Sequence, residues 1–301
     1  MTETNIFDPN VIGRVKGLEV RSYRLAESFM VGMHRSRLRG ISTEFAQHRQ
    51  YVTGDDTKFL DWKVFAKTDR FYIKEFEAET NLPVLFLVDV SPSMFFKSET
   101  AAMSKFDYAA TVTATMAYLL MQQKDTFGLG LFSDTIRSYL PAKGSGSHFR
   151  NVIDILEGAS GGGKTDVGKA MMTTGPRLKG KGIVVVISDF VEDEGELTKA
   201  LGQMSYMGHD VVLYHIEDPE ERDFPFAGQT IFRGTEDEGR LLCDPEDLRE
   251  AYFRERRRHL DSIHNTCVRF RYDLLDMPTD GPIDEVLTAF LAERLTRRRT
   301  R

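Results

Sequence analysis

The sequence has only two cysteines among its 301 residues, Cys243 and Cys267, and they form no CxxC pair. Two cysteines are too few for a disulfide framework, and they suit a reducing compartment. The sequence also has no apolar run near the roughly 18 residues that a membrane helix requires. Its first residues have neither the basic nor the apolar region of a secretory signal. We therefore expect a soluble cytoplasmic protein with no integral membrane segment.

An excess of positive charge is also lacking. Lysine and arginine number 40 against 46 aspartates and glutamates, so the net charge is −6 and no bulk cationic surface is expected. Nucleic acid is therefore not an expected partner, because its phosphates bind chiefly to such surfaces. The seven histidines form no HExxH pattern, so no zinc-binding helix is predicted. The length suits about two average domains, or one large domain with a sizeable core.

Short apolar runs are the clearest positive feature of the sequence. Four of them are typical of strands buried on both faces, at 84–90, 126–132, 182–188 and 210–216. Apolar residues at helical spacing lie between these runs, over 103–120, 147–157 and 167–178. This alternation predicts an α/β fold, a doubly wound, mainly parallel sheet of Rossmann-like type with helices on both faces.

The two ends of the chain are less regular. Residues 1–82 are polar and arginine-rich, with apolar runs at 28–33 and 70–76 that predict short, partly exposed strands. We expect this N-terminal elaboration to pack on a main domain over 83–301. Beyond 217 the pattern predicts two short strands at 229–234 and 239–244, a helix over 245–264 that begins at Asp244-Pro245, an alternating strand over 267–275, and a last helix from about Ile283.

Hydroxyl and carboxylate side chains stand at the ends of three predicted segments. Asp89, Ser91 and Ser93 lie where the first buried strand stops. Thr165 ends a glycine-rich loop just before a helix, and Asp189 ends the strand at 182–188. Open parallel sheets place ligand sites at the carboxyl ends of their strands, so we expect these five side chains at one rim.

An oxygen-only donor set indicates a hard cation. Mg²⁺ prefers octahedral oxygen ligands and keeps several waters, and Mn²⁺ accepts the same donors. We expect Ser91, Ser93 and Thr165 to ligate the ion directly, while Asp89 and Asp189 hold waters. An ion without a direct carboxylate ligand is electron-poor, so its open position prefers a carboxylate from a partner protein. The simpler alternative is that DxSxS forms only an Asx or Ser turn.

These motifs carry a resemblance to a known domain. The DxSxS pattern at 89–93, the T-D-x-G-x-A pattern from Thr165 to Ala170, and the strand that ends Ser188-Asp189 resemble a von Willebrand factor A domain with a metal-ion-dependent adhesion site. The resemblance covers about residues 83–216. It implies the same fold and a metal-binding role for the same five residues.

A longer stretch narrows the resemblance. Residues 40–79 and 276–294 are similar to the bacterial "domain of unknown function 58" family, and the resemblance spans about residues 16–295. The positions that match the family pattern are Glu44, Phe45, Arg49, Tyr51, Gly54, Asp55, Asp56, Asp61, Trp62 and Ala66. Lys67 or Thr68 stands where an arginine is common. The resemblance implies a partner of a MoxR-type AAA+ ATPase that acts as a chaperone or adaptor in assembling or activating other proteins.

A rival motif lies in the glycine-rich loop. Residues Gly158 to Thr165 match the P-loop pattern GxxxxGK[ST], which is typical of nucleotide-binding enzymes. A P-loop needs a buried strand directly before it, so that amides of the following helix converge on phosphate. Apolar residues at 149, 152, 153 and 156 predict a helix there instead. We therefore favour a metal-site loop with Lys164 in solvent, and a P-loop NTPase or a metal-assisted hydrolase is the enzymatic alternative.

Two further patterns are weaker. The same loop has the G-x-S-x-G form of a nucleophile elbow around Ser160, but an elbow also needs a preceding strand. Asp55, Asp56 and Asp61 suggest a carboxylate cluster for hydrolysis. A Gly-Asp-Asp turn whose acids cap amides or pair with Arg49 is the simpler interpretation.

The sequence therefore predicts a protein without catalytic activity. We expect Mg²⁺ or Mn²⁺ at Asp89, Ser91, Ser93, Thr165 and Asp189 to capture an acidic side chain of a partner protein. A purely structural scaffold is the third alternative, and it predicts no thermal shift with either ion, because only ligands that bind the native state stabilise it.

Overall fold

The computed structural model describes residues 5–35, 47–50, 72–75, 82–191, 194–234 and 239–299. The chain divides into a larger unit, Met1–Phe29 with Leu82–Ala292, and a smaller unit, Met30–Asn81 with Glu293–Arg301. In the smaller unit, β1 (Gln47–Gln50) and β2 (Tyr72–Glu75) form an antiparallel pair. The strand predicted near 70–76 is therefore present.

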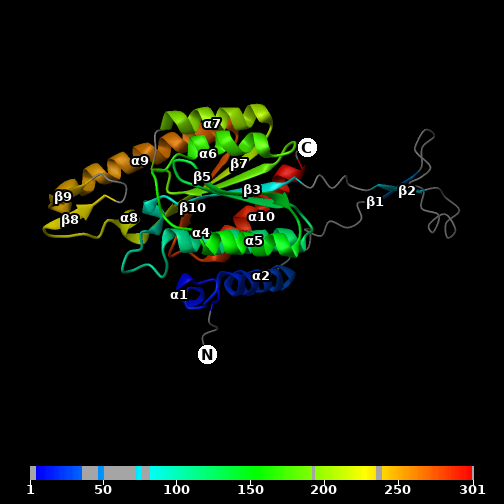
Figure 1. The fold of residues 1–301 in the computed structure, drawn as a ribbon, viewed down its shortest axis with the longest axis horizontal. Coiled ribbons are helices and arrows are strands. Elements are labelled where there is room, and N and C mark those ends of the chain that lie inside the picture. The colour runs from blue at the N-terminus through cyan, green and yellow to red at the C-terminus, as the bar shows by residue number, and fades with distance from the viewer. Residues whose placement is uncertain are drawn as a thin grey trace. The chain divides into compact units, whose positions relative to one another are not determined.

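A six-stranded sheet forms the centre of the larger unit (Figure 1). Its strands, in spatial order, are β10 (Asp273–Pro278), β7 (Asp210–Glu217), β6 (Ile183–Ser188), β3 (Val84–Asp89), β4 (Phe127–Phe132) and β5 (Ile136–Lys143). All neighbours pair in parallel except β4 and β5, which are antiparallel. The four buried strands predicted from the apolar runs are all present. The predicted α/β class, a doubly wound and mainly parallel sheet, is confirmed.

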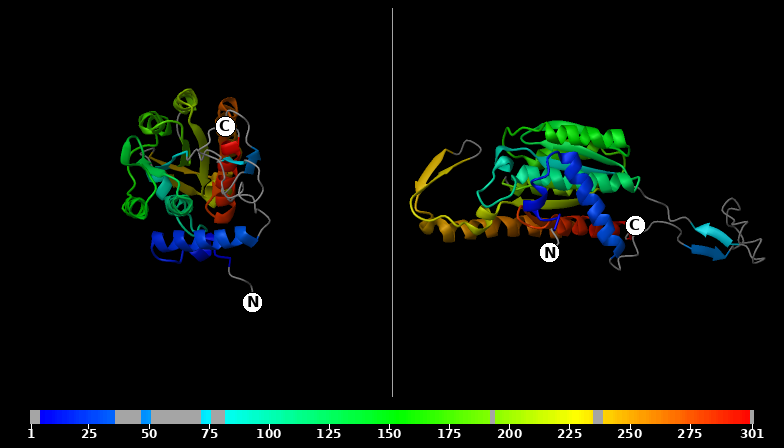
Figure 2. Two further views of the ribbon diagram at one scale, coloured as in Figure 1. Left: turned by 90° about the vertical axis from the view of Figure 1, so that its right-hand side faces the viewer. Right: turned by 90° about the horizontal axis from the view of Figure 1, so that it is seen from below.

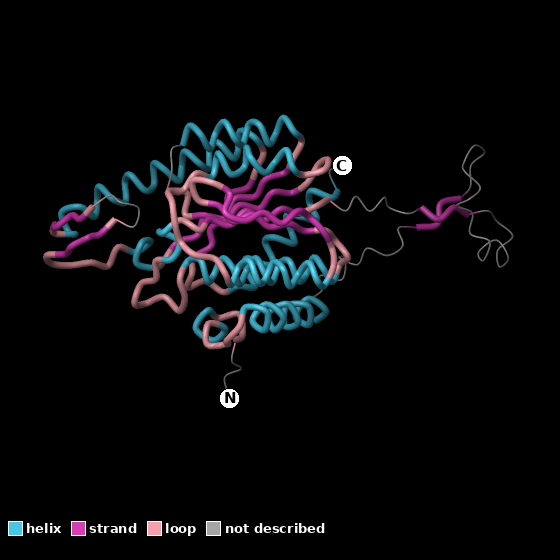
Figure 3. The backbone as a smooth tube through the Cα atoms, viewed as in Figure 1, coloured by secondary structure: helices cyan, strands magenta, loops and turns pink. Residues whose placement is uncertain are grey.

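Helices cover both faces of this sheet (Figures 2 and 3). On one face, α6 (Val167–Thr174), α7 (Glu194–Met207) and α9 (Pro245–Phe270) share a core with strand residues such as Leu85 and Val186. On the other face lie α4 (Lys105–Gln122) and α10 (Ile283–Arg299), and the ring of Phe290 is 6.2 Å from that of Phe86. The helix α5 (Gly146–Glu157) packs beside α4. None of the described helices is long and apolar enough to cross a bilayer.

The N-terminal residues form helices, α1 (Pro9–Ile12) and α2 (Leu18–Arg35), so the strand predicted at 28–33 is wrong. The buried residues of α2 recur at helical spacing: Leu18, Ser22, Leu25, Ala26 and Phe29. A short apolar run does not by itself distinguish a strand from the buried stripe of a helix. The ring of Tyr23 lies 5.3 Å from that of Tyr118 on α4, so this part of α2 packs on the helical layer.

Several predictions concern residues outside the described part of the chain. These are the family-motif positions Glu44, Phe45, Tyr51, Gly54, Asp55, Asp56, Asp61, Trp62 and Ala66. The carboxylate cluster and the turn with Arg49 therefore stay predictions. So does the packing of residues 1–82 as one elaboration on the main domain.

The boundary between α9 and β10 differs from the prediction. Helix α9 continues to Phe270, and Arg271 ends it in a left-handed conformation with φ of 59°. The strand predicted over 267–275 begins only at Asp273. Ile263 and Cys267, four residues apart, are both buried against the core, so the last turn is held as helix. Apolar–polar alternation over a few residues determines the local structure less strongly than this burial of one helix face.

The remaining elements lie at the margins of the sheet. Strand β5 was not predicted, because its residues are only partly buried and it contains Pro141, which edge strands tolerate. The two short strands expected after residue 217 are present as β8 (Thr230–Arg233) and β9 (Arg240–Cys243), an antiparallel pair. Before them, α8 (Pro219–Asp223) follows β7 directly.

Candidate metal centre

The candidate site lies where the winding of the sheet changes direction. The chain passes from β3 to β4 on one side, and later returns to place β6 on the other side of β3. Loops after two adjacent parallel strands with opposite connections diverge, which leaves a crevice at their carboxyl ends. Asp89 is the last residue of β3, and Asp189 directly follows β6. The fold itself therefore brings the two aspartates to one rim.

The DxSxS segment is folded by its own aspartate. The Oδ1 atom of Asp89, which is fully buried, accepts a hydrogen bond of 2.7 Å from the backbone N–H of Ser91. The chain then enters a short 3-10 helix, η2 (Pro92–Phe95), and the Oγ atoms of Ser91 and Ser93 lie 3.0 Å apart. The Asx turn considered as an alternative is thus present. It occupies only one carboxylate oxygen and brings the two serine hydroxyls together.

The second carboxylate oxygen of Asp89 accepts hydrogen bonds from hydroxyls of two other segments. Ser188 Oγ donates to Asp89 Oδ2 at 2.7 Å, and Thr165 Oγ1 donates to the same atom at 3.2 Å. The backbone N–H of Gly162 donates to Val90 O at 3.2 Å, which ties the glycine-rich loop to the DxSxS segment. Residues more than 70 positions apart are therefore joined around one buried carboxylate.

Gly163 allows the glycine-rich loop to approach the site. Its φ is +75°, a conformation that strains any residue with a Cβ atom. A Cβ at this position would lie 2.4 Å from Asp134 Oδ1 and 2.9 Å from Ser133 Oγ. Asp166 then caps α6 by accepting from the N–H of Lys169 at 2.7 Å. The turn and the cap together fix the position of Thr165.

The two carboxylate oxygens of Asp189 differ in their hydrogen bonds. Its Oδ2 atom accepts a hydrogen bond of 2.8 Å from Nζ of Lys105, and both side chains are almost fully buried. Its Oδ1 atom is buried without a hydrogen-bond partner among the described residues. An unsatisfied buried carboxylate oxygen is costly, so this atom marks a place where a water or an ion would be stabilised.

The two aspartates have opposite pKa shifts. Burial, and then the charge of Asp189, raises the pKa of Asp89 to about 7. Burial also acts to raise the pKa of Asp189, but the charge and hydrogen bond of Lys105 outweigh it and hold that pKa below its ordinary value. The hydroxyl of Ser93 lowers it further. Near neutral pH, Asp189 is therefore the ionised member of the pair, and Asp89 has little compensating positive charge.

All five predicted side chains meet at this rim, and the donor set suits a hard cation. Three hydroxyls and two carboxylates supply oxygen only, which is the chemistry of Mg²⁺ or Mn²⁺. Among the described residues, no cluster of three or more histidines, cysteines, aspartates or glutamates could hold a metal ion, so hydroxyls have to take part in any site here. The unpartnered oxygen of Asp189 and the raised pKa of Asp89 both fit a missing positive charge. Their role as ligands stays a prediction.

The sequence did not predict the buried lysine. Lys105 is only 1% exposed, and its Nζ donates to Asp189 and to both carboxylate oxygens of Glu221, at 2.7 and 2.9 Å. Burial acts to lower the pKa of Lys105, but the charges of Asp189 and Glu221 raise it above its ordinary value. Its sequence neighbourhood, Ser104 as a helix N-cap and then an amphipathic helix, gives no sign of a buried charge.

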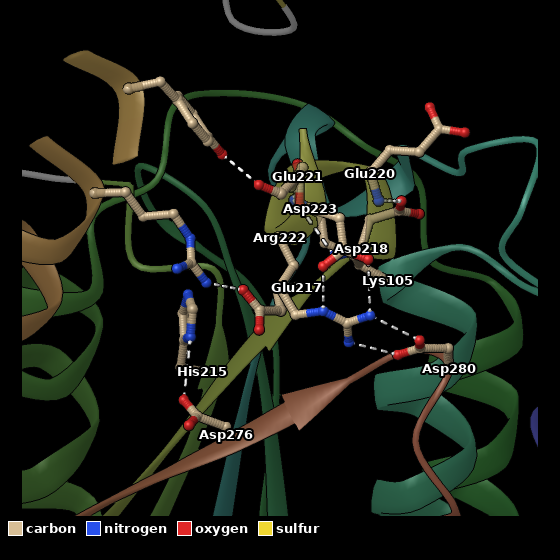
Figure 4. Close-up of polar contacts among 12 residues, drawn as sticks. Lys105, His215, Glu217, Asp218, Glu220, Glu221, Arg222, Asp223, Asp276 and Asp280 are labelled. Atoms are coloured by element: carbon tan, nitrogen blue, oxygen red, sulfur yellow. Dashed lines mark hydrogen bonds and ion pairs between the residues drawn. The ribbon is translucent and has the colours of Figure 1, made fainter. Parts of the chain in front are cut away.

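Glu221 belongs to a wider polar network at the ends of β7 and β10 (Figure 4). Its carboxylate also accepts from the N–H of Asp218, which completes a capping box at the start of α8. In the same helix, Arg222 makes two hydrogen bonds of 2.9 Å to Asp280 after β10. Helix α8, which carries the Glu221 partner of Lys105, is thus fixed at both of its ends.

The glycine-rich loop does not have the setting of a P-loop. Helix α5 runs to Glu157 and Gly158 caps it, so the predicted helix before the loop is confirmed and no strand precedes the motif. No buried strand therefore leads into the loop and directs the amides at the start of α6 toward a phosphate, as a P-loop requires. The same setting opposes a nucleophile elbow at Ser160. Lys164 is exposed, as predicted.

The chain is similar in sequence to mycobacterial proteins. The chain is 24% identical to the uncharacterized protein Rv1480 of Mycobacterium tuberculosis over 307 residues, which cover 98% of this chain and 93% of that protein. The uncharacterized protein Mb1516 of Mycobacterium bovis gives the same values.

Solved structures of related architecture are more distant. The conserved hypothetical protein BatB from Bacteroides thetaiotaomicron is 16% identical with a TM-score of 0.49, over 71% of this chain and 99% of that chain. The SpRpn10 VWA domain is 12% identical with a TM-score of 0.44, over 68% of this chain and 93% of that chain.

A family model gives the assignment. The model described as "Protein of unknown function DUF58" matches residues 47–262, which is well over half of the chain. This span contains the whole DxSxS segment, the glycine-rich loop and the β6 strand end. The chain therefore belongs to the DUF58 family.

Proposed function

We propose that this protein is a non-enzymatic adaptor that binds Mg²⁺ or Mn²⁺ and uses the ion to capture a carboxylate of a partner protein. One observation carries the proposal. Hydroxyls and carboxylates from two strand ends and from the glycine-rich loop before α6 meet around the buried Asp89, while Oδ1 of Asp189 has no hydrogen-bond partner among the described residues.

The roles of the residues follow from their chemistry. Ser91, Ser93 and Thr165 would ligate the ion through neutral hydroxyls, and Asp89 and Asp189 would accept hydrogen bonds from its waters. The ion would supply concentrated positive charge with an exchangeable position for an outside oxygen. Because the nearest protein ligands are neutral, a carboxylate from a partner is a better ligand for that position than water.

The partner we propose is a MoxR-type AAA+ ATPase or one of its client proteins, in the cytoplasm. The support for this choice is the family to which the chain belongs, together with a site whose chemistry selects an acidic side chain. The absence of a strand before the glycine-rich loop argues against nucleotide binding by this chain itself. In this proposal, any ATP hydrolysis belongs to the partner.

The test begins with metal binding by the full chain. Isothermal titration with Mg²⁺ and Mn²⁺ should show one site, and Thr165→Val should weaken it by removing a hydroxyl at nearly constant volume. Thr173→Val is the matched control, because Thr173 is exposed on α6 and only bonds the backbone of its own helix. Wild-type protein that binds neither ion would refute the proposal.

Partner capture is tested separately. The full chain should retain a MoxR-type ATPase in Mg²⁺ and release it in EDTA, and Asp89→Ala should abolish retention while circular dichroism stays native. Retention that is the same in EDTA would exclude a metal-bridged contact.

A further inference from the structure

Lys105 is a buried charged residue at the rim that the proposed function does not use. It stands in the first turn of α4, is 1% exposed, and makes three charge-assisted hydrogen bonds to Asp189 and Glu221. Burying an ammonium group is costly unless carboxylates compensate for its lost hydration. A lysine kept here therefore has a strong effect on any other charge at the site.

The hydrogen bond from Lys105 makes the two carboxylate oxygens of Asp189 unequal. Oδ2 is held by the ammonium at 2.8 Å, and Oδ1 is the atom without a described partner. An ion or its water can therefore interact with Oδ1 while Oδ2 stays bound to lysine. The lysine restrains Asp189 and keeps the whole carboxylate from turning to the ion.

The lysine also sets the charge of the site. Asp89 and Asp189 together carry two negative charges when ionised, and Lys105 cancels one of them. A divalent cation then leaves the loaded site with one net positive charge. Without the ammonium, the same loaded site would be neutral. Glu221 offsets part of this effect, but its side chain is 35% exposed, so water screens its charge more strongly than that of Asp189.

We propose that Lys105 keeps the metal-loaded site cationic, and so weakens its hold on the divalent cation while strengthening its capture of an anionic partner group. The inference rests on the proposed function, because it concerns the same site. It makes Lys105 a specificity-determining residue for a partner carboxylate. Coulomb interactions at short range in a buried site are large enough for one charge to change affinity by a factor of ten or more.

A merely structural lysine predicts something different. If the ion pairs only fasten α4 to α8, removal of the lysine should loosen the rim, and the affinities for metal and for carboxylate should fall together. A charge-setting lysine predicts changes of opposite sign. This difference in sign separates the two roles without any assumption about stability.

The experiment uses the full chain, with Lys105→Met and Glu221→Gln as the variants. Methionine removes the charge and keeps an unbranched side chain, and glutamine removes the opposing charge while it can still complete the capping box. Mn²⁺ affinity is measured by titration at pH 8 for the wild-type protein and both variants. Carboxylate capture is measured by the loss of Mn²⁺-enhanced water proton relaxation on adding acetyl-Gly-Glu-Gly-amide, with acetyl-Gly-Gln-Gly-amide as the neutral control.

The expected results are opposite for the two variants. Lys105→Met should bind Mn²⁺ about tenfold more tightly and the acidic peptide more weakly, whereas Glu221→Gln should bind Mn²⁺ more weakly and the peptide at least as well. If wild-type protein binds Mn²⁺ but Lys105→Met binds it equally or more weakly, the inference is wrong and the proposed function stands. If wild-type protein binds no Mn²⁺, the proposed function fails and the inference fails with it. Should Lys105→Met not fold, unchanged Mn²⁺ affinity in Glu221→Gln overturns the inference.

Discussion

Gly163 offers the sharpest test of how the glycine-rich loop builds the candidate site. Alanine at this position has to adopt a φ of +75°, which costs about 1–2 kcal/mol for a residue with a Cβ atom. Its Cβ would also lie 2.4 Å from Asp134 Oδ1 and 2.7 Å from Arg137 Nη2. These two side chains form an exposed ion pair, and breaking such a pair costs at most about 1 kcal/mol. We therefore expect Gly163→Ala to destabilise the protein by about 1–3 kcal/mol.

Gly180→Ala is the matched control for backbone strain. Gly180 has a φ of +77°, almost the same as Gly163, but no atom beyond its two chain neighbours lies within 4 Å of the position of a new Cβ. Its substitution should cost only the conformational strain, about 1–2 kcal/mol. Urea unfolding of both variants therefore isolates the steric contribution at Gly163.

Metal binding separates the two variants further. Thr165 is two residues from Gly163, so a loop that shifts to relieve the contact should displace its hydroxyl from Asp89. We expect Gly163→Ala to weaken Mg²⁺ binding by about tenfold or more, which corresponds to about 1.4 kcal/mol per factor of ten, and Gly180→Ala to leave it unchanged. Equal stability loss and equal Mg²⁺ affinity in the two variants would show that the loop does not position Thr165 as described.

Three further predictions follow from the same contacts. In EDTA, Asp89 should make the protein less stable as pH rises from about 4 to 7, because its folded-state pKa of about 7 lies above its ordinary value and the folded state binds a proton that the unfolded state releases. The loss is at most about 4 kcal/mol, and Asp89→Asn should flatten the pH dependence of urea unfolding. Ser188→Ala removes a buried donor to Asp89 and should cost about 1–3 kcal/mol in the same assay, whereas a loss near zero would contradict the hydrogen bond. Phe224→Ala should remove ring contacts to Phe232 and Tyr252 and so reduce amide hydrogen-exchange protection in β8 and β9, while protection in β3 stays unchanged.

The sequence predicts the central sheet well, because burial on both faces leaves a plain signal. Strand β3 is apolar from Val84 to Val88 and β6 from Ile183 to Ile187, and neither run has a helical alternative of comparable length. Four of the predicted oxygen donors lie at or after strand ends, which share one rim in a parallel sheet, whereas Thr165 lies in the loop between α5 and α6.

Other features depend on contacts between distant residues. Lys105 is buried because Asp189 and Glu221, 84 and 116 residues further along the chain, compensate its charge, and no local pattern contains that information. The strands predicted at 28–33 and at 267–270 are helical, because a short apolar run in the first case and a few alternating apolar residues in the second suit both structures. The edge strand β5 lacks an apolar run altogether.

The separation of the site residues along the chain affects biosynthesis. Asp89 obtains its hydrogen bonds from residues 165 and 188, so a nascent polypeptide that has emerged only as far as β4 has no complete rim. Pairing of β6 beside β3 has to come first, and such long-range parallel pairing is among the slower steps of folding. The candidate metal centre is therefore assembled late in synthesis, when most of the sheet that supports it already exists.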